Sequence, residues 1–190
     1  MATTLIVPGL RGSGDAHWQT WFEQQLDDVE RVHQADWEQP DLASWSQQVI
    51  AAIDASKRPV WLVAHSFGVL ASVVAIQQRA KKVAGAMLVA PADPEKFGIE
   101  TLIPNGLIEV DSVVVASTND PWLTPLKATY WADRWGSRLL NLGRVGHINV
   151  DSGFGPWPEG LAIYADLINQ RPSATARRGA LAQQRWSLAS

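Results

Sequence analysis

The sequence predicts an α/β fold, a doubly wound and mostly parallel sheet of six strands. Short apolar runs with few interruptions alternate along the chain with segments whose apolar residues recur at helical spacing. Nearly continuous apolar strands are typical of parallel sheets, because helices bury both faces of such a sheet. If the chain crosses to the other face after the second strand, the strand order is 2-1-3-4-5-6. Ligands then bind beyond the carboxyl ends of strands one and three, at the switch point.

Each expected strand is a short run bounded by turn-forming residues. The first is β-branched and ends at a glycine-rich loop, the second alternates weakly between apolar and polar residues, and the remaining four are apolar. The expected strands span, in order, residues 3–7, 29–35, 60–64, 85–90, 113–116 and 138–142.

Each expected helix has an apolar face, and the first two also have a capping residue. Asp15 is expected to cap the first helix and Asp41 the second. The third helix follows Ser66 and breaks near residues 81–82, and the last two span residues 122–135 and 159–168. The segment from Pro91 to about Leu107 contains too much proline and glycine for a long helix, and residues 143–158 are expected to form a glycine- and proline-rich loop.

One domain accounts for most of the chain. The 190 residues, 46% of them apolar and 18% charged, suit a single soluble globular domain, which we place at residues 1–172. The composition then changes to small and basic residues. Residues 173–190 are therefore expected to be a C-terminal tail that is partly disordered or forms a short helix.

Composition also excludes several classes of function. A formal net charge of −3 provides no basic surface for phosphates, so nucleic acid is not an expected partner. No apolar run approaches the roughly 20 residues that a membrane helix requires, so no membrane partner is expected. The chain has no cysteine, which removes thiolate nucleophiles and cysteine metal sites. The amino terminus lacks the features of a secretory signal, and a cytoplasmic location is the default expectation.

Ser66 lies where the third strand meets the following helix. In a nucleophile elbow the serine occupies a sharp strand-to-helix turn with small residues two positions away on either side. Here those residues are Ala64 and Gly68, so the usual G-x-S-x-G is A-H-S-F-G. The alternative is a buried strand followed by an ordinary serine N-cap, and these residues alone do not decide between the two.

A serine nucleophile needs a histidine base. His147 follows the last strand on a loop at the carboxyl edge of the sheet, where such a base belongs. His65 points away from Ser66 by strand alternation and is expected to support the turn. His33 is expected to be a structural residue of the second strand, and His17 to touch the pocket.

The histidine in turn needs a carboxylate to orient it. Asp120 directly follows the fifth strand and so lies at the same edge, although it could instead cap the next helix. Asp93 and Asp151 are competing candidates. The order Ser66, Asp120, His147 matches the chain order of the α/β-hydrolase triad, which favours Asp120.

An oxyanion also needs N–H donors. The backbone N–H of Phe67 is the first candidate, and the backbone N–H of Leu10 is the second, because Gly9 permits a close approach of that loop. The alternative for residues 9–14 is a simple turn. No Walker A or dinucleotide-binding pattern is present, so no cofactor is expected.

Several short motifs together resemble one family. They lie at residues 7–9, 13–15, 17–19, 65–68, 90–91, 117–121, 146–149, 152–155 and 157–158. The chain resembles the small serine hydrolases related to retinoblastoma-binding protein nine, also called YdeN-like, over about residues 3–170. The resemblance implies a compact three-layer α/β-hydrolase without a large lid, with Ser66 as nucleophile, Asp120 as acid and His147 as base. Ala64 departs from the family's glycine.

The expected function is a metal-independent serine hydrolase that cleaves small carboxylic esters, or amides, through an acyl-enzyme. The alternatives are a non-catalytic binding module on the same fold and an acyltransferase. His17, Trp18, Trp122 and Trp157 flank the expected site and are candidates for substrate binding. The alternative for at least some of the three tryptophans is packing in the core. No motif for a protein partner is present.

Overall fold

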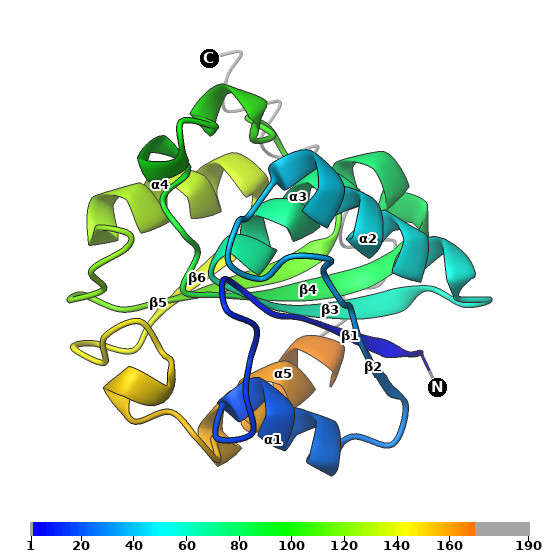
Figure 1. The fold of residues 1–190 in the computed structure, drawn as a ribbon, viewed down its shortest axis with the longest axis horizontal. Helices are drawn as coiled ribbons and strands as arrows, with labels where there is room; N and C mark the ends of the chain where they lie inside the picture. The colour runs from blue at the N-terminus through cyan, green and yellow to red at the C-terminus, as the bar shows by residue number, and fades with distance from the viewer. Residues whose placement is uncertain (1, 170–190) are drawn as a thin grey trace, which may run out of the picture.

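A computed structural model describes residues 2–169 of the chain (Figure 1). The sheet in this part of the chain has six strands, and all of its strand pairs are parallel. They are β1 (Thr4–Val7), β2 (Val29–Arg31), β3 (Val60–His65), β4 (Val83–Val89), β5 (Asp111–Ala116) and β6 (Arg138–Asn141). Their order is β2-β1-β3-β4-β5-β6, as predicted, with the switch point between β1 and β3.

Helices cover both faces of the sheet, which gives three layers (Figure 1). On one face lie α1 (Trp18–Gln25) and α5 (Pro158–Asn169), and on the other lie α2 (Leu42–Ala55), α3 (Phe67–Arg79) and α4 (Pro125–Trp135). Each face has its own apolar cluster. The predicted α/β-hydrolase-like fold is therefore confirmed, while the predicted tail at 173–190 lies outside the described residues.

Short 3-10 helices take the place of longer helices in several connections. They are η1 (Ala80–Lys82), η2 (Pro94–Phe97), η3 (Glu100–Leu102) and η4 (Val150–Ser152). The connection from β4 to β5 contains only η2 and η3 among these elements, so no large lid is inserted there. Among residues 2–169, no helix is long and apolar enough to cross a membrane.

Two helices begin later than predicted. His17, and not Asp15, is the N-cap of α1, because residues 14–17 form a turn in which His17 N–H donates to the Gly14 carbonyl at 2.9 Å. The helix α4 begins at Pro125 with Thr124 as its N-cap, since the preceding segment is held in a separate turn. The predicted cap at Asp41 is confirmed, with its side chain accepting from Ser44 N–H at 2.7 Å.

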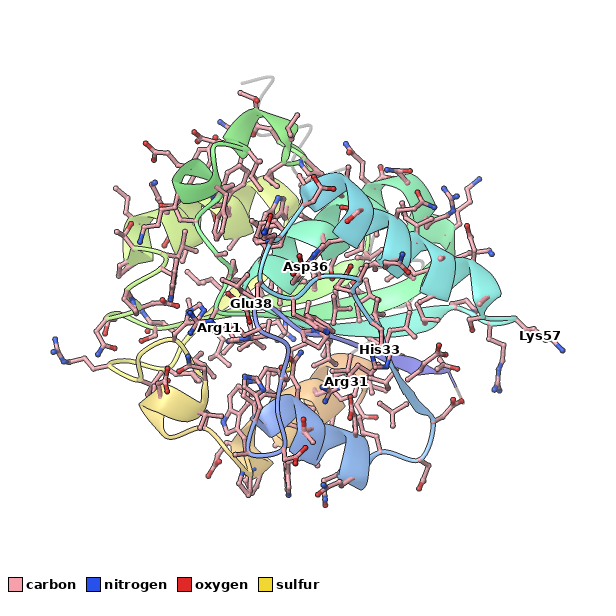
Figure 2. The ribbon with its side chains drawn as sticks, in the orientation of Figure 1. Arg11, Arg31, His33, Asp36, Glu38 and Lys57 are labelled. Atoms are coloured by element: carbon pink, nitrogen blue, oxygen red, sulfur yellow. The ribbon has the colours of Figure 1, made fainter. Side chains whose placement is uncertain are left out.

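The strand β2 is shorter than predicted. It ends at Arg31, although Val32 N–H still donates to the Ile6 carbonyl of β1 at 2.9 Å. A turn follows at residues 36–39, in which Asp36 accepts the backbone N–H groups of Glu38 and Gln39. His33 lies beyond the strand and is exposed (Figure 2). The prediction that His33 is a structural residue of β2 is therefore wrong.

Candidate functional site

Ser66 occupies the sharp turn between β3 and α3. Its backbone angles, φ 55° and ψ −123°, lie where a residue with a β-carbon is strained by about 1–3 kcal/mol. Its backbone N–H donates to the Val89 carbonyl at 3.1 Å, which fixes the turn to the neighbouring strand. Ser66 stands at the N-cap position of α3, but its side chain makes no capping hydrogen bond. Its hydroxyl is therefore left for another role.

Two glycines let the first loop approach this turn. A β-carbon on Gly9 would lie 2.7 Å from the β-carbon of Ser66, and one on Gly68 would lie 2.4 Å from the Pro8 carbonyl oxygen. Both distances are below any normal contact, so only glycine fits at either position without a shift of the backbone. Ala64, which replaces the usual glycine, is fully buried in β3 and paired with Val7.

A continuous chain of hydrogen bonds runs from Ser66 to Asp120. The Ser66 hydroxyl lies 2.9 Å from His147 Nε2, and His147 Nδ1 lies 2.9 Å from both carboxylate oxygens of Asp120. The carboxylate can only accept, so Nδ1 carries the proton and Nε2 accepts from the hydroxyl. The side chains of His147 and Asp120 are 7% and 3% exposed, which shields both hydrogen bonds from water.

Asp120 also accepts the backbone N–H of Trp122 at 2.8 Å, so its turn-forming role and its contact with His147 coexist. The competing carboxylates lie elsewhere. Asp93 binds Lys127 Nζ at 2.6 Å, and Asp151 lines the pocket with its side chain exposed. The structure therefore brings together Ser66, Asp120 and His147 from three loops at the carboxyl edge of the sheet.

Three contacts hold the loop that carries His147. The Trp18 indole N–H donates to the Ile148 carbonyl at 2.9 Å, and Gly146 N–H donates to the side-chain oxygen of Asn119 at 2.8 Å. His65 Nε2–H donates to the carbonyl of His147 itself at 3.0 Å. These contacts fix the backbone on both sides of His147, so its imidazole is positioned before any ligand binds.

His17 lies beside these groups with its ring almost buried. Its Nδ1 accepts the backbone N–H of Gln19 at 3.1 Å, and its ring centroid lies 5.0 Å from that of His65. Burial, with smaller contributions from the positive charge of Arg31 and from His147, lowers the pKa of His17 from 6.5 to about 4. Burial also places the pKa of His65 well below its ordinary value, with His147 and then His17 adding to the effect. Both imidazoles are thus neutral near pH 7.

Two polar side chains hold the glycine-rich loop onto the sheet. The Gln19 amide donates to the carbonyls of Val7 and Val63 at 3.2 and 3.0 Å, and its oxygen accepts from the Ser13 hydroxyl at 2.6 Å. Arg31 donates to the Ser13 carbonyl at 2.6 Å and pairs with Glu23. The loop is therefore tied to β1, β2 and β3 at the switch point.

A pocket of about 410 Å³ opens in front of the Ser66 hydroxyl. The glycine-rich loop forms one side of the pocket, and residues from the loops after β4, β5 and β6 form the rest. Its lining residues are Leu10, Arg11, Gly12, Gly14, His17, His65, Ser66, Phe97, Trp122, His147, Asn149, Val150 and Asp151.

Comparison with known proteins identifies the family of this chain and solved structures similar to it. A family model described as "Serine hydrolase" matches residues 4–166. The chain belongs to the serine hydrolase family. A crystal structure from Pectobacterium atrosepticum, described as a YdeN-like hydrolase, is 40% identical to this serine hydrolase with a TM-score of 0.85, over 89% of this chain and 91% of that one. The comparison with curated proteins gives no significant match.

A second solved structure, the ydeN gene product of B. subtilis, has 21% identity and a TM-score of 0.75 over 90% of this chain and 100% of that one, which supports the fold. Family membership and these structures support a hydrolase. The YdeN-like part of the predicted resemblance is confirmed, whereas neither structure named here carries the name of retinoblastoma-binding protein nine.

In this serine hydrolase, the three tryptophans predicted to bind substrate lie in different environments. Trp122 lines the pocket, 40% exposed, with its ring centroid 6.1 Å from that of His147. Trp18 and Trp157 do not line it. They pack against each other at 5.2 Å in the core between the sheet and its helices, so their prediction as substrate-binding residues is corrected. Core aromatic contacts account for both rings.

Phe97 is a pocket residue that the sequence did not suggest. Its ring stacks on Trp122 at 6.4 Å and contacts the buried Phe67 at 5.0 Å. Lys96 braces this pair, since its Nζ donates to the Pro121 carbonyl at 2.6 Å and lies 5.4 Å from the centre of a Trp122 ring. An aromatic wall therefore closes the β5 side of the pocket in this serine hydrolase.

The charged groups of the pocket lie at its rim. Arg11 is highly exposed and lies close to Glu38 from the following turn, with its Nε 3.6 Å from a carboxylate oxygen (Figure 2). Such exposed pairs contribute little to stability. In the part of the chain that the structure describes, no group of three or more His, Cys, Asp or Glu residues is arranged to hold a metal ion.

Proposed function

We propose that this serine hydrolase cleaves small carboxylic esters, and amides by the same steps, through an acyl-enzyme formed on Ser66. The observation that carries the proposal is the hydrogen-bonded chain from Ser66 through His147 to Asp120, which ends at a pocket. The three residues have the roles of a Ser-His-Asp triad.

In the first step the Ser66 oxygen attacks the ester carbonyl carbon while His147 Nε2 removes the hydroxyl proton. The 2.9 Å contact between these atoms supports this transfer. Asp120 stabilises the imidazolium that forms and holds its Nδ1–H in place. His147 then gives the proton to the leaving oxygen, and the acyl group remains on Ser66.

In the second step His147 takes a proton from a water molecule whose oxygen attacks the acyl carbonyl carbon. The bond to Ser66 then breaks, His147 returns the proton to the Ser66 oxygen, and the carboxylic acid leaves. His147 carries every proton transfer in these steps, so the proposal needs neither a metal ion nor a cofactor.

The negative charge that develops on the carbonyl oxygen needs two N–H donors. Phe67 is the first residue of α3, where backbone N–H groups have no partner within the helix. The Leu10 N–H makes no hydrogen bond within residues 2–169, and Leu10 lines the pocket. These two groups are proposed as the oxyanion hole, in which each donor is typically worth about 2.7–4 kcal/mol of barrier.

The pocket supports a small substrate with an apolar part. Its volume of about 410 Å³ is that of a site for one small molecule, and the Phe97 and Trp122 rings offer an apolar surface beside His147. A hydrocarbon acyl or alcohol group of the ester would lie against these rings.

A panel of p-nitrophenyl esters of increasing acyl length, run with the wild type and Ser66→Ala, tests the proposal. We expect hydrolysis by the wild type and its loss in the variant. A fluorophosphonate probe gives a second measurement, because it labels only an activated nucleophile. Equal labelling of the wild type and Ser66→Ala would rule out Ser66 as that nucleophile.

A further inference from the structure

The ring of His17 has one nitrogen occupied and one that faces the pocket. Nδ1 accepts the Gln19 N–H, so in the neutral ring the proton is on Nε2. Nε2 has no hydrogen-bond partner among residues 2–169, and it is not sealed in the core, since His17 lines the pocket. His17 as a residue is only 5% exposed, so a ligand that fills the pocket is the natural acceptor for this N–H.

We propose that His17 Nε2–H donates a hydrogen bond to an uncharged oxygen of the substrate, so that the enzyme selects esters with an ether, hydroxyl or second carbonyl oxygen near the scissile bond. This inference rests on the proposed function of Ser66 and names the chemical class of its substrate.

The surroundings of His17 favour an uncharged acceptor. The groups that face its ring are His65, Trp18 and His147, and Arg31 adds a positive charge nearby. None of these is an anion that could stabilise a positive imidazole, and burial opposes the charge as well. The charge of Arg31 is already paired with Glu23, and a neutral N–H donor offers no charge to offset the desolvation of a carboxylate. An ether or hydroxyl oxygen loses less hydration on binding.

The topology places this donor opposite the aromatic wall. His17 belongs to the loop after β1, and Trp122 to the loop after β5. In the sheet, β3, which leads into Ser66, lies between β1 and β5. A substrate that reacts with Ser66 therefore has a polar donor on one side and apolar rings on the other. The apolar and oxygen-bearing parts of the ester would occupy these two sides.

Two pairs of isosteric esters test the inference. The p-nitrophenyl esters of methoxyacetate and butyrate differ by an ether oxygen on the acyl side, and 2-methoxyethyl and butyl acetate differ by one on the alcohol side. For each pair, we compare the ratio of kcat/KM for the ether ester to that for the hydrocarbon ester with the same ratio of rate constants for hydrolysis by hydroxide. For at least one pair, the wild-type ratio should exceed the hydroxide ratio by about 2- to 10-fold, which is the value of one hydrogen bond.

Two substitutions separate the pocket donor from the helix cap. His17→Asn keeps a capping oxygen for α1 but is too short to reach the pocket as Nε2 does. His17→Gln places an amide N–H near the position of Nε2 but lacks the cap. The ether preference should fall by about 2- to 10-fold in His17→Asn and persist in His17→Gln. Thermal unfolding of each variant reports the loss of the cap separately.

The inference is overturned if His17→Asn leaves the ratio of kcat/KM, ether ester over hydrocarbon ester, unchanged for both pairs. It is also overturned if the wild-type ratio is no higher than the ratio for hydrolysis by hydroxide in both pairs. A wild-type preference for a carboxylate-bearing ester, such as monobutyl succinate, over the ether esters overturns the uncharged acceptor. In all of these outcomes the ester hydrolysis by Ser66 still stands. A wild type inactive on all five esters overturns the proposed function and this inference together.

Discussion

The backbone strain at Ser66 makes a prediction that needs no substrate. Ser66→Ala and Ser66→Gly both remove the hydroxyl, but only glycine removes the β-carbon that φ 55° and ψ −123° disfavour. The strain is about 1–3 kcal/mol. Glycine loses about 0.5–1 kcal/mol through the greater freedom of its unfolded chain. Ser66→Gly should therefore be more stable than Ser66→Ala by up to about 2.5 kcal/mol.

Urea unfolding followed by tryptophan fluorescence measures this difference at pH 7.5. Thermal unfolding gives a second measurement, in which a gain of 1 kcal/mol in unfolding free energy raises Tm by roughly 2–4 °C for a chain of this size. Ser72 is the matched control, because it lies inside α3 on the same element. There glycine should be less stable than alanine by about 1 kcal/mol. If Ser66→Gly proves less stable than Ser66→Ala, as at Ser72, the turn stores no strain and the reasoning is wrong.

Three other predictions follow from the site. Asp120→Asn should lower kcat of ester hydrolysis by about 10⁴-fold at pH 7.5, because the uncharged amide does not stabilise the imidazolium and its N–H can donate to Nδ1, which favours the wrong tautomer of His147; a loss below 10-fold would contradict its role. Because the folded pKa of His17 is about 4 against 6.5, the unfolded state binds the proton first as the pH falls. Between pH 6.5 and 4 the wild type should thus lose about 3 kcal/mol of unfolding free energy that His17→Asn keeps, as urea titrations at each pH can check. Gly9→Ala should lower kcat/KM far more than Gly14→Ala, because a β-carbon at Gly9 meets Ser66 and one at Gly14 meets nothing within 4 Å; equal losses would argue against a close approach.

The sheet and its edge were predictable because they depend on short-range patterns. Apolar runs identified the strands, and parallel strands end at a common edge, so Ser66, Asp120 and His147 could be placed near one another from their positions after strands. The start of α1 was not predictable in the same way. Asp15 is a better capping residue than His17, but the turn at residues 14–17 delays the helix.

The walls of the pocket depend on long-range packing and were harder to foresee. Phe97 lies in a single 3-10 turn, where no periodicity shows which way a side chain points. Trp18 looked like a pocket residue because it follows the glycine-rich loop, but it lies on the face of α1 that packs into the core. The contact of His65 with the His147 carbonyl depends on the fold of a loop 82 residues later, which no local pattern reports.

The hydrogen bond from Trp18 to the Ile148 carbonyl joins the first loop of the domain to the last one before α5. A chain leaving the ribosome presents Ser66 long before His147 has been synthesised, and at that stage the serine has no partner to remove its proton. Reactivity toward esters would therefore arise only when translation of the domain is nearly complete. Under the proposed function, a chain that ends before His147 would lack the base that Ser66 needs and would not hydrolyse esters.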